Sequence, residues 1–449
     1  MDCVNYTLKP LIKSSKIFSV NAVIYSLKKV NSKKGMKDLR ILHTSDWHIG
    51  KKLKEHERLD EFRKFFEWLG DTVSNENIDV LLVSGDIFDS INPSIEAQEI
   101  YYSFLAETSG KLCGHVIIIS GNHDSAPFID APSSVMRRCN VHVIGSASED
   151  PSDEIITLKN SDGKTELIVC AVPFLHDKDL RTVNEGEGFD DIDTQIKTGI
   201  VRHYESVLRT ARELRGSDDV PIIAMGHLFL EAGKTLNGEG EHSLYVGTAA
   251  KVGSDIFTDD IAYTALGHLH SPQKIGRADI RYSGSPIALT FGELGVQKSV
   301  SIVDFDGKNF AGVREIPVPV FQRMERVSGN WQEIESSIMK LACLDESVWL
   351  EVTYSGSEQI TNLQESLDKL IKPCPNLEVL SVIDEMNYRN DSETEISAGL
   401  NGRTLDDIEP VKMLQSLMKI KDTPEDKQPE LERLYRQILN EISSASGDK

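Results

Sequence analysis

Acidic, amide and imidazole side chains follow short apolar runs at five places in the chain. In chain order they are Asp46 and His48, Asp86, Asn122, His227, and the pair His268 and His270. Oxygen and imidazole donors without cysteine suit Mn, Fe or Zn rather than a thiolate-bound structural zinc. Seven donors are too many for one tetrahedral ion but suit two ions that share a bridging carboxylate. Two metals about 3.5–4 Å apart can activate a water and hold both oxygens of an in-line phosphoryl displacement. The set therefore predicts a phosphoester substrate.

The apolar runs before these side chains predict the elements that position them. The runs are 41–43, 80–83, 116–119, 222–225 and 262–266. Continuous apolar runs of this kind are typical of strands buried on both faces of a covered sheet. Loops at the carboxyl ends of such strands converge on one edge, where open α/β proteins place their sites. We therefore expect one polar site built from five distant segments.

The order of the motifs resembles that of the calcineurin-like metallophosphoesterases. It runs Asp-x-His, Gly-Asp-x-x-Asp, Gly-Asn-His-Asp, Gly-His and Gly-His-x-His, and all five motifs are intact. A single Gly-His or Asp-x-His is weak evidence, but five motifs in order are strong evidence. Residues 43–51 and 84–89 resemble more closely the nuclease subunits of bacterial SbcCD complexes, and the likeness runs from about Leu39 to the C-terminus. It implies an α/β fold, a calcineurin-like metallophosphoesterase sandwich with a small α/β cap domain and C-terminal helices.

The resemblance also assigns the ligands of two divalent ions, most simply Mn²⁺. One ion would be bound by Asp46, His48, Asp86 and His270. The other would be bound by Asp86, Asn122, His227 and His268, so that Asp86 is the bridge.

Three further polar residues receive supporting roles from the same resemblance. His123 would face the scissile phosphate and either stabilise its charge or protonate the leaving oxygen. Asp124 would orient that imidazole, as carboxylates beside working histidines often do. For Asp89, a similar supporting role and a plain loop-capping role are both open. Trp47, between two ligands, is expected to pack under the site rather than to stack on a base.

The charge balance is unusual for an enzyme that acts on nucleic acid. The net charge is −22, whereas proteins that bind DNA alone normally present a basic face. Two metal ions would offset several carboxylates, and a partner could supply basic surface. Lys51, Lys52 and Lys54 lie just past the first metal loop, where contact with phosphate and a solvated face are equally plausible.

The first 35 residues differ from the remainder. They hold seven lysines and one acid, a charge of +6, which leaves −28 for the rest. Met36 resembles the natural start of the family's subunits, so we expect residues 1–35 to be a basic extension, disordered or produced by a mis-assigned start codon. A basic targeting or DNA-binding arm is the alternative.

Other compositional features predict a cytoplasmic, nucleoid-associated protein. No apolar run approaches the length that spans a bilayer, and no secretory cleavage pattern is present. The six cysteines have no paired spacing, which is typical of reduced thiols.

Two domains and a tail are expected. Residues 36–318 would form the nuclease domain, in which Phe62, Phe65, Phe66 and Leu69 share one helical face. Core packing is the simpler explanation of these aromatic side chains, and contact across a two-fold dimer is the alternative. Residues 319–395 would form a small α/β domain, with strands at 320–327, 348–353 and 377–382 and helices at 331–341 and 363–371. The resemblance implies that this domain is a cap that faces DNA beside the nuclease site, and a purely stabilising role is the alternative.

The tail would consist of a linker at 396–410 and two amphipathic helices at 411–445. Helices beyond a linker have no obvious core of their own, so we expect a docking module for another protein, with packing back onto the nuclease domain as the alternative.

The resemblance names the partner as an SbcC-type coiled-coil ATPase that binds ATP, within a heterotetramer containing a homodimer of this chain. It implies ATP-dependent exonuclease and hairpin or single-strand endonuclease activity on DNA ends. A small-molecule or phosphoprotein phosphatase on the same scaffold is the alternative.

Overall fold

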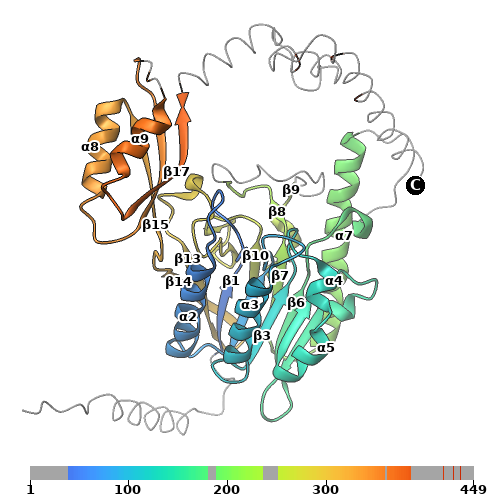
Figure 1. Ribbon diagram of the computed structural model, residues 1–449. Coiled ribbons are helices and arrows are strands. Elements are labelled where there is room, and N and C mark those ends of the chain that lie inside the picture. Colours follow the sequence, from blue (N-terminus) through green and yellow to red (C-terminus); the bar gives the residue numbers. More distant parts are fainter. Residues whose placement is uncertain are drawn as a thin grey trace, which may run out of the picture.

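The computed structural model describes residues 39–180, 189–235 and 251–385, except 359 and 361, together with Met418, Gln428 and Tyr435. The predicted extension at 1–35 and the predicted linker at 396–410 lie outside the described residues. So does the docking module at 411–445, apart from those three single positions. The described chain forms a two-sheet body and a smaller three-stranded unit (Figure 1).

The first sheet has six strands in the order β14-β13-β1-β2-β3-β4. They are β1 (Leu39–Thr44), β2 (Val80–Ser84), β3 (His115–Ile119), β4 (Val141–Ile144), β13 (Ser299–Asp306) and β14 (Asn309–Pro317). Strands β1 to β4 run parallel to one another, and β13 and β14 add an antiparallel hairpin beside β1.

The second sheet also has six strands, in the order β11-β12-β10-β7-β6-β5. They are β5 (Ile155–Lys159), β6 (Thr165–Ala171), β7 (Ile222–His227), β10 (Tyr263–Gly267), β11 (Gln273–Lys274) and β12 (Ile280–Tyr282). The inner strands β6, β7, β10 and β12 are parallel, and the edge strands β5 and β11 are antiparallel to their neighbours. All five predicted strands are therefore confirmed.

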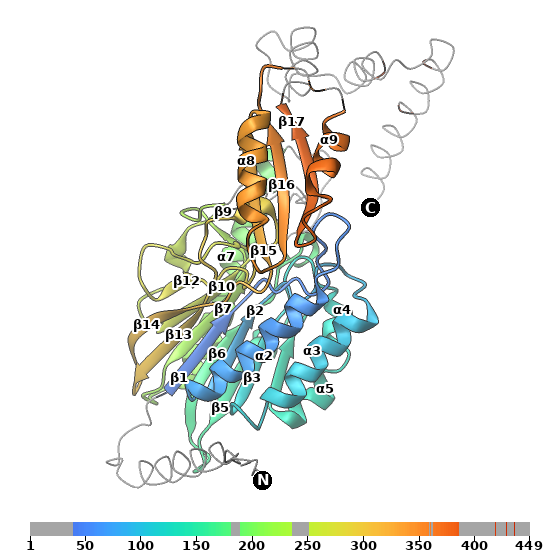
Figure 2. The ribbon, with the colours of Figure 1, turned by 60° about the vertical axis from the view of Figure 1, so that its left-hand side comes forward.

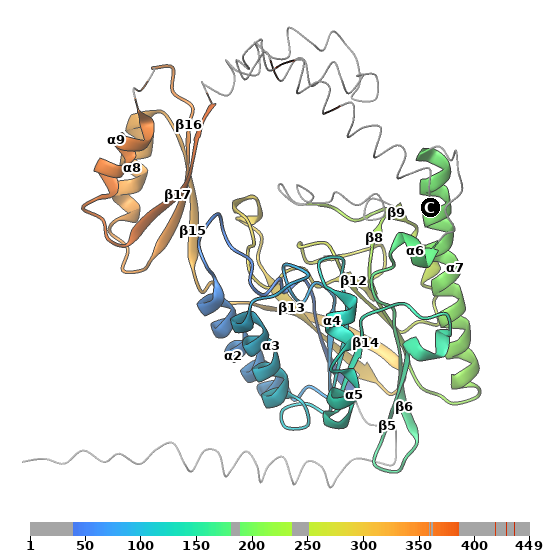
Figure 3. The same cartoon turned by 45° about the vertical axis from the view of Figure 1, so that its right-hand side comes forward.

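Alternating side chains of the parallel strands build a layered core. On β2, Leu82 packs between the two sheets, whereas Leu81 and Val83 pack toward the outer helices. Helices α2 (Leu59–Asn75) and α3 (Ile95–Thr108) cover the first sheet, and α7 (Phe189–Arg215) covers the second (Figure 3). Burial on both faces explains why these strands are continuously apolar.

The aromatic face of α2 belongs to this core. Phe62, Phe65, Phe66 and Leu69 are buried in the cluster that joins α2 and α3 to the first sheet. Core packing, the simpler expectation for these residues, is therefore confirmed.

Shorter elements complete the body. They are α4 (Ala126–Asp130), α5 (Ser133–Met136), α6 (Asp177–Leu180), the strand pair β8 (Phe229–Leu230) and β9 (Lys251–Val252), and 3-10 turns at Arg137–Cys139, Pro151–Glu154, Ser254–Ile256 and Phe291–Glu293. None of the helices in the described part of the chain has the length and apolar content that a membrane crossing needs.

The smaller unit has the predicted strand–helix order. It consists of β15 (Arg323–Gly329), α8 (Trp331–Leu341), β16 (Val348–Tyr354), α9 (Leu363–Ile371) and β17 (Leu377–Asp384), with the three strands parallel. The bounds of both helices are as predicted, and Asn330 and Glu333 form a capping box at the start of α8. The first strand begins at Arg323 rather than at residue 320, because its pairing with β16 begins at Arg323 opposite Val348, and Val320 before it is exposed. The bounds of the whole domains remain a prediction.

A small apolar cluster joins this cap to the body. Leu53 and Phe291 of the body contact Met324 of the cap, and Trp349 packs against the same cluster. Leu53 lies on the loop that follows β1, and Phe291 begins the 3-10 turn. The cap therefore stands over loops at one end of the sandwich (Figure 2).

Candidate metal centre

The seven predicted ligands come from five strands of both sheets. His227 is the last residue of β7, and the others lie in the loops that follow β1, β2, β3 and β10, namely Asp46, His48, Asp86, Asn122, His268 and His270. The carboxyl ends of β1, β2 and β3 lie together in one sheet and those of β7 and β10 in the other. The two sets of ends meet where His227 at the end of β7 contacts the carbonyl of Ser84 at the end of β2. The predicted convergence is therefore present.

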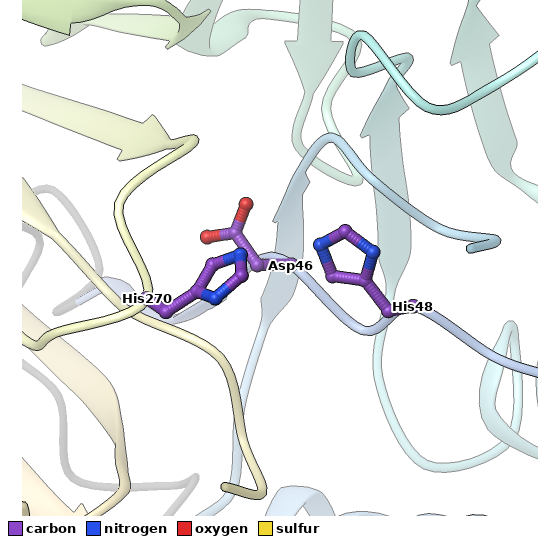
Figure 4. A group of neighbouring side chains, drawn as sticks. All are labelled: Asp46, His48 and His270. Carbon is purple, nitrogen blue, oxygen red and sulfur yellow. The ribbon is translucent and has the colours of Figure 1, made fainter. Parts of the chain in front are cut away.

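Asp46, His48 and His270 form one group of donors (Figure 4). One ligand atom from each lies within 4.8 Å of the other two. His48 Nε2 also lies 3.4 Å from Asp86 Oδ2. Asp46, His48 and Asp86 are almost wholly buried.

Asn122, His227 and His268 form a second group beside it. His227 Nε2 lies 3.0 Å from Asn122 Oδ1, and His268 Nδ1 lies 3.1 Å from the same oxygen. His227 Nε2 is also 3.3 Å from Asp86 Oδ2. A second constellation of oxygen and nitrogen donors is thus assembled around the amide.

Asp86 belongs to both groups through a single oxygen. Its Oδ2 faces His48 on one side and His227 on the other. Its Oδ1 accepts a hydrogen bond of 2.9 Å from the backbone N–H of His123. This places one carboxylate oxygen between two sets of donors, as a bridging ligand requires.

The ionisation of the buried groups fits a cation. His48 Nε2 is buried without a hydrogen-bond partner among the described residues, and a metal would satisfy it. Burial lowers the pKa of His48 to about 4 and that of His268 to about 3, which keeps both imidazoles neutral for ligation. Burial also acts to lower the pKa of His227, but the Asp86 carboxylate raises it to about 9. A divalent ion would replace the proton that this pair shares.

Three of the four imidazoles are held by their Nδ1 atoms. His270 Nδ1 lies 3.0 Å from Glu293 Oε1, His48 Nδ1 lies 3.3 Å from Asp89 Oδ1, and His227 Nδ1 donates to the carbonyl of Ser84 at 2.9 Å. A partner at Nδ1 fixes the ring and leaves Nε2 for a metal. His268 differs, because its Nδ1 faces the centre.

Glu293 is a functional residue that the sequence analysis missed. It is buried, and Lys298 Nζ lies 2.6 Å from its Oε2. Burial acts to raise the pKa of Glu293, but His270 and Lys298 lower it to about 2, so it stays ionised. No motif surrounds Glu293, so the only available signal was an acidic residue between Gly292 and Gly295.

The ligand loops adopt a backbone that most residues avoid. Asp46, His48, Asp86 and His268 have φ angles of 51°, 48°, 50° and 102°. Such conformations cost free energy in non-glycine residues and cluster at functional sites. Backbone hydrogen bonds from Asp46 to Gly85 and from His48 to Asp86, at 3.0 and 2.9 Å, hold two of the loops together.

Glycines permit the close approach of these loops. A Cβ at Gly121 would collide with Asp86, and a Cβ at Gly267 would collide with the carbonyl of Ser84. A Cβ at Gly85 would strike the His227 imidazole, and its φ of +86° also favours glycine. The Gly residues in the motifs therefore leave room for neighbouring loops and, at Gly85, allow a positive φ.

His123 lies at the first donor group, but its orienting partner differs from the prediction. The His123 ring centre is 4.7 Å from that of His48, and His123 Nδ1 is 3.1 Å from the carbonyl oxygen of Asp89. The Asp124 carboxylate instead accepts backbone hydrogen bonds from Ile87, Phe88 and Gly121. The expectation that Asp124 orients His123 is therefore wrong, because the carboxylate is used to join the second and third loops.

Asp89 contacts two histidines of the site, which favours the supporting role over the loop-capping role. Its carbonyl contacts His123, its carboxylate faces His48, and Lys51 Nζ lies 3.0 Å from the same carboxylate. Lys51 is 21% exposed and lies at the rim of the centre.

Trp47 and Phe174 are two of the aromatic residues around the centre. Trp47 is buried, meets Phe66 and Phe104 edge-on, and donates to Thr44 Oγ1 at 3.0 Å, so its packing role is confirmed. Phe174, which follows β6, meets the His227 ring edge-on at 6.2 Å. This sixth loop carries none of the predicted ligands, and the sequence analysis missed it.

Comparison with known proteins shows the family of the chain. A family model described as calcineurin-like phosphoesterase matches residues 39–272, and one described as type 5 capsule protein repressor C-terminal domain matches residues 320–422. The chain is similar to the SbcD subunit of the SbcCD nuclease of Rhodobacter capsulatus, with 34% identity over 75% of this chain and 85% of that protein. It is also similar to the SbcD proteins of Escherichia coli K12, with 29% identity over 90% and 99%, and Bacillus subtilis, with 31% over 78% and 87%. The chain therefore belongs to the SbcD family of calcineurin-like phosphoesterases.

Proposed function

We propose that the chain is the nuclease subunit of an ATP-dependent complex that processes DNA ends in repair, recombination and replication. It would act as a double-strand exonuclease and as a single-strand and hairpin endonuclease. The observation that carries the proposal is the position of Asp86 Oδ2 between His48 Nε2 and His227 Nε2. The names of the relatives, which are nuclease subunits, support DNA as the substrate class.

Two divalent ions, most simply Mn²⁺, would be held by the residues of the centre. Asp46, His48, Asp86 and His270 would bind one ion, and Asp86, Asn122, His227 and His268 the other. When bound, such a pair polarises a phosphodiester and supplies a water-derived nucleophile for in-line hydrolysis.

His123 would act on the leaving side of the reaction. With Nδ1 donating to the carbonyl of Asp89, its Nε2 is the nitrogen available to the substrate. With a second proton on Nε2, the imidazolium can there stabilise the charge that develops on the departing sugar oxygen or give that oxygen its Nε2 proton. Asp124 would contribute indirectly, by fixing the loops that carry Asp86 and His123.

The remaining parts of the chain would select and deliver the substrate. The division at 36–318, 319–395, 396–410 and 411–445 remains our proposal. The cap would meet DNA and select its shape, since it stands over the loops at the site's end of the sandwich. The segment at 411–445 would dock on an SbcC-type ATPase, and two copies of the chain would pair within the assembly.

One experiment separates the nuclease from a phosphatase. The full-length chain and its candidate ATPase partner are given a blunt or hairpin duplex with Mn²⁺ and ATP, and 4-nitrophenyl phosphate is tested in parallel. We expect cleavage of DNA and weak hydrolysis of the phosphomonoester. Efficient phosphomonoester hydrolysis without DNA cleavage would favour the small-molecule phosphatase and contradict the proposal.

Truncation tests the docking segment separately. A chain that ends at Gly402 should lose co-purification with the ATPase and keep metal-dependent phosphodiesterase activity. Persistent co-purification would place the partner contact elsewhere.

A further inference from the structure

The strand pair β8–β9 presents a cation and an aromatic ring beside the metal centre. Phe229 of β8 and Lys251 of β9 are register partners in this parallel pair. Lys251 Nζ lies 4.4 Å from the centre of the Phe229 ring, within the range of a cation–π interaction. The Phe229 ring centre lies 6.0 Å from that of His268. The lysine is thus connected to a proposed metal ligand through one aromatic side chain.

The two faces of this strand pair have different surroundings. Leu230 and Val252 are buried in the core beneath α7. Because side chains alternate along a strand, Phe229 and Lys251 lie on the opposite face. Phe229 is half-buried and packs against the edge of the same core cluster, and Lys251 is exposed. The pair therefore borders the site instead of contributing wholly to the core.

The backbone around Phe229 is fixed by Tyr282. The Tyr282 hydroxyl donates to the carbonyl of Leu228 at 2.8 Å and accepts from the N–H of Leu230 at 2.9 Å. Tyr282 is fully buried. Phe229 lies between these two anchored residues, so its backbone is held in place beside the site.

Lys251 differs from the other lysine near the centre. Lys51, on the side of His48, contacts the Asp89 carboxylate. Among the described residues, no carboxylate pairs with Lys251. The chain as a whole has a net charge of −22. An exposed Lys251 ammonium near His268 that is not neutralised by a described carboxylate can therefore bind an anionic ligand.

We propose that Phe229 and Lys251 form a subsite for a backbone phosphate within a few nucleotides of the scissile one, on the His268 side. This inference rests on the proposed nuclease function. A nucleic acid strand carries one phosphate per about 3.4 Å of helix axis. The Lys251 ammonium lies 4.4 Å from the centre of the Phe229 ring, and that centre lies 6.0 Å from the centre of the His268 ring. A nucleic acid strand bound at the metal centre therefore reaches the ammonium within a few nucleotides. The Phe229 ring holds the ammonium in place and lines the path of the strand.

The test compares Lys251→Ala with Lys164→Ala in the full-length chain assembled with its ATPase. Lys164 is also exposed, but it lies in the turn before β6, at the opposite end of that strand from the site. The KM for duplex DNA is measured at several NaCl concentrations, with bis(4-nitrophenyl) phosphate, which lacks flanking phosphates, as the second substrate.

Lys251→Ala should raise the KM for DNA by up to about five-fold at low salt, as expected for one exposed charge pair. The slope of log KM against log salt should fall by about 0.7–0.9, the loss of one phosphate contact. The ratio of the KM for DNA to that for the small diester should rise, and Lys251→Arg should restore it. Phe229→Leu, which keeps an apolar side chain, should give a smaller rise.

Two results would overturn the subsite. One is a KM and salt slope for Lys251→Ala equal to those of Lys164→Ala, while the wild type cleaves DNA normally. The other is an equal loss on both substrates, which would indicate a structural fault. Failure of the wild-type assembly to cleave DNA would instead overturn the proposed function and this inference together.

Discussion

The two halves of the metal centre are held by different kinds of groups. In the half that contains His48 and His270, the Nδ1 atoms face the carboxylates of Asp89 and Glu293. In the other half, His227 donates to the carbonyl of Ser84. A carboxylate partner raises the basicity of an imidazole ligand and can be altered by mutation, whereas a backbone carbonyl cannot. The first half therefore depends on side-chain charge, and the second depends on the shape of the main chain.

The half that contains His48 and His270, here called the charged half, also depends on two lysines. Each carboxylate is itself paired with a lysine, Asp89 with Lys51 and Glu293 with Lys298. Lys298 is buried and Lys51 is partly exposed. The same half also borders the cap, because Phe291 in the turn that carries Glu293 packs in the cap–body cluster. The two carboxylate–lysine pairs and the contact with the cap thus lie on the same side of the centre.

The largest effect is expected where the two halves meet. Asp86→Ala should remove the carboxylate that faces both His48 and His227 and so empty both positions. Metal content should fall toward zero and DNA cleavage should drop by more than about 10³-fold, beyond the cost of losing one electrostatic donor. Elemental analysis of the purified protein, with activity measured alongside, checks this. Retention of both ions would contradict the bridging role.

His123→Ala should separate chemistry from metal binding. The imidazole holds no ion in our assignment, so both ions should remain while cleavage falls by about 10²–10⁴-fold, the usual contribution of a general acid. Metal content and turnover on a duplex end are measured on the same sample. Normal turnover would be fatal to the assigned role.

Glu293→Gln should weaken one half of the centre and spare the other. Loss of the charge beside His270 should reduce affinity at the first position by about 10–100-fold. Titration of the metal-free protein with Mn²⁺ should then show two separated binding steps. Glu346→Gln, on an exposed cap residue paired with Arg323, is the matched control and should leave the titration unchanged. Equal weakening of both steps would mean that the halves are not independent.

The smallest effect is expected at the exposed end of the charged half. Lys51→Met removes the partner of Asp89, but water can replace an exposed ammonium, so metal affinity should change by no more than a few-fold. Lys298→Met should have a larger effect, because it leaves the Glu293 charge buried without its lysine. Thermal unfolding and the same Mn²⁺ titration compare the two variants. A larger effect for Lys51→Met would reverse the comparison.

The sequence was sufficient for the features that depend on local patterns. The five strands before the ligands and the bounds of α8 and α9 follow from apolar runs, helical periodicity and capping residues. The grouping of the predicted ligands within each sheet follows from the rule that parallel strands end at one edge, whereas the meeting of the two groups depends on how the two sheets pack.

The sequence was insufficient where a contact depends on how distant loops fold together. Glu293 reaches His270 across 23 residues without a motif. Asp124 is adjacent to His123, yet the turn directs its carboxylate to the backbone of the preceding loops. Phe229 and Lys251 become neighbours only through the pairing of β8 with β9.

The interface between cap and body contains a tryptophan that can serve as an intrinsic fluorescent probe. Trp349 lies in the cap–body cluster and its ring is 5.7 Å from that of His56 on the body. Trp47 and Trp68 pack inside the body, and Trp331 packs inside the cap. Any rotation of the cap away from the body would change the surroundings of Trp349 while leaving those three indoles as they are. Intrinsic fluorescence can therefore follow cap movement during turnover without an attached dye.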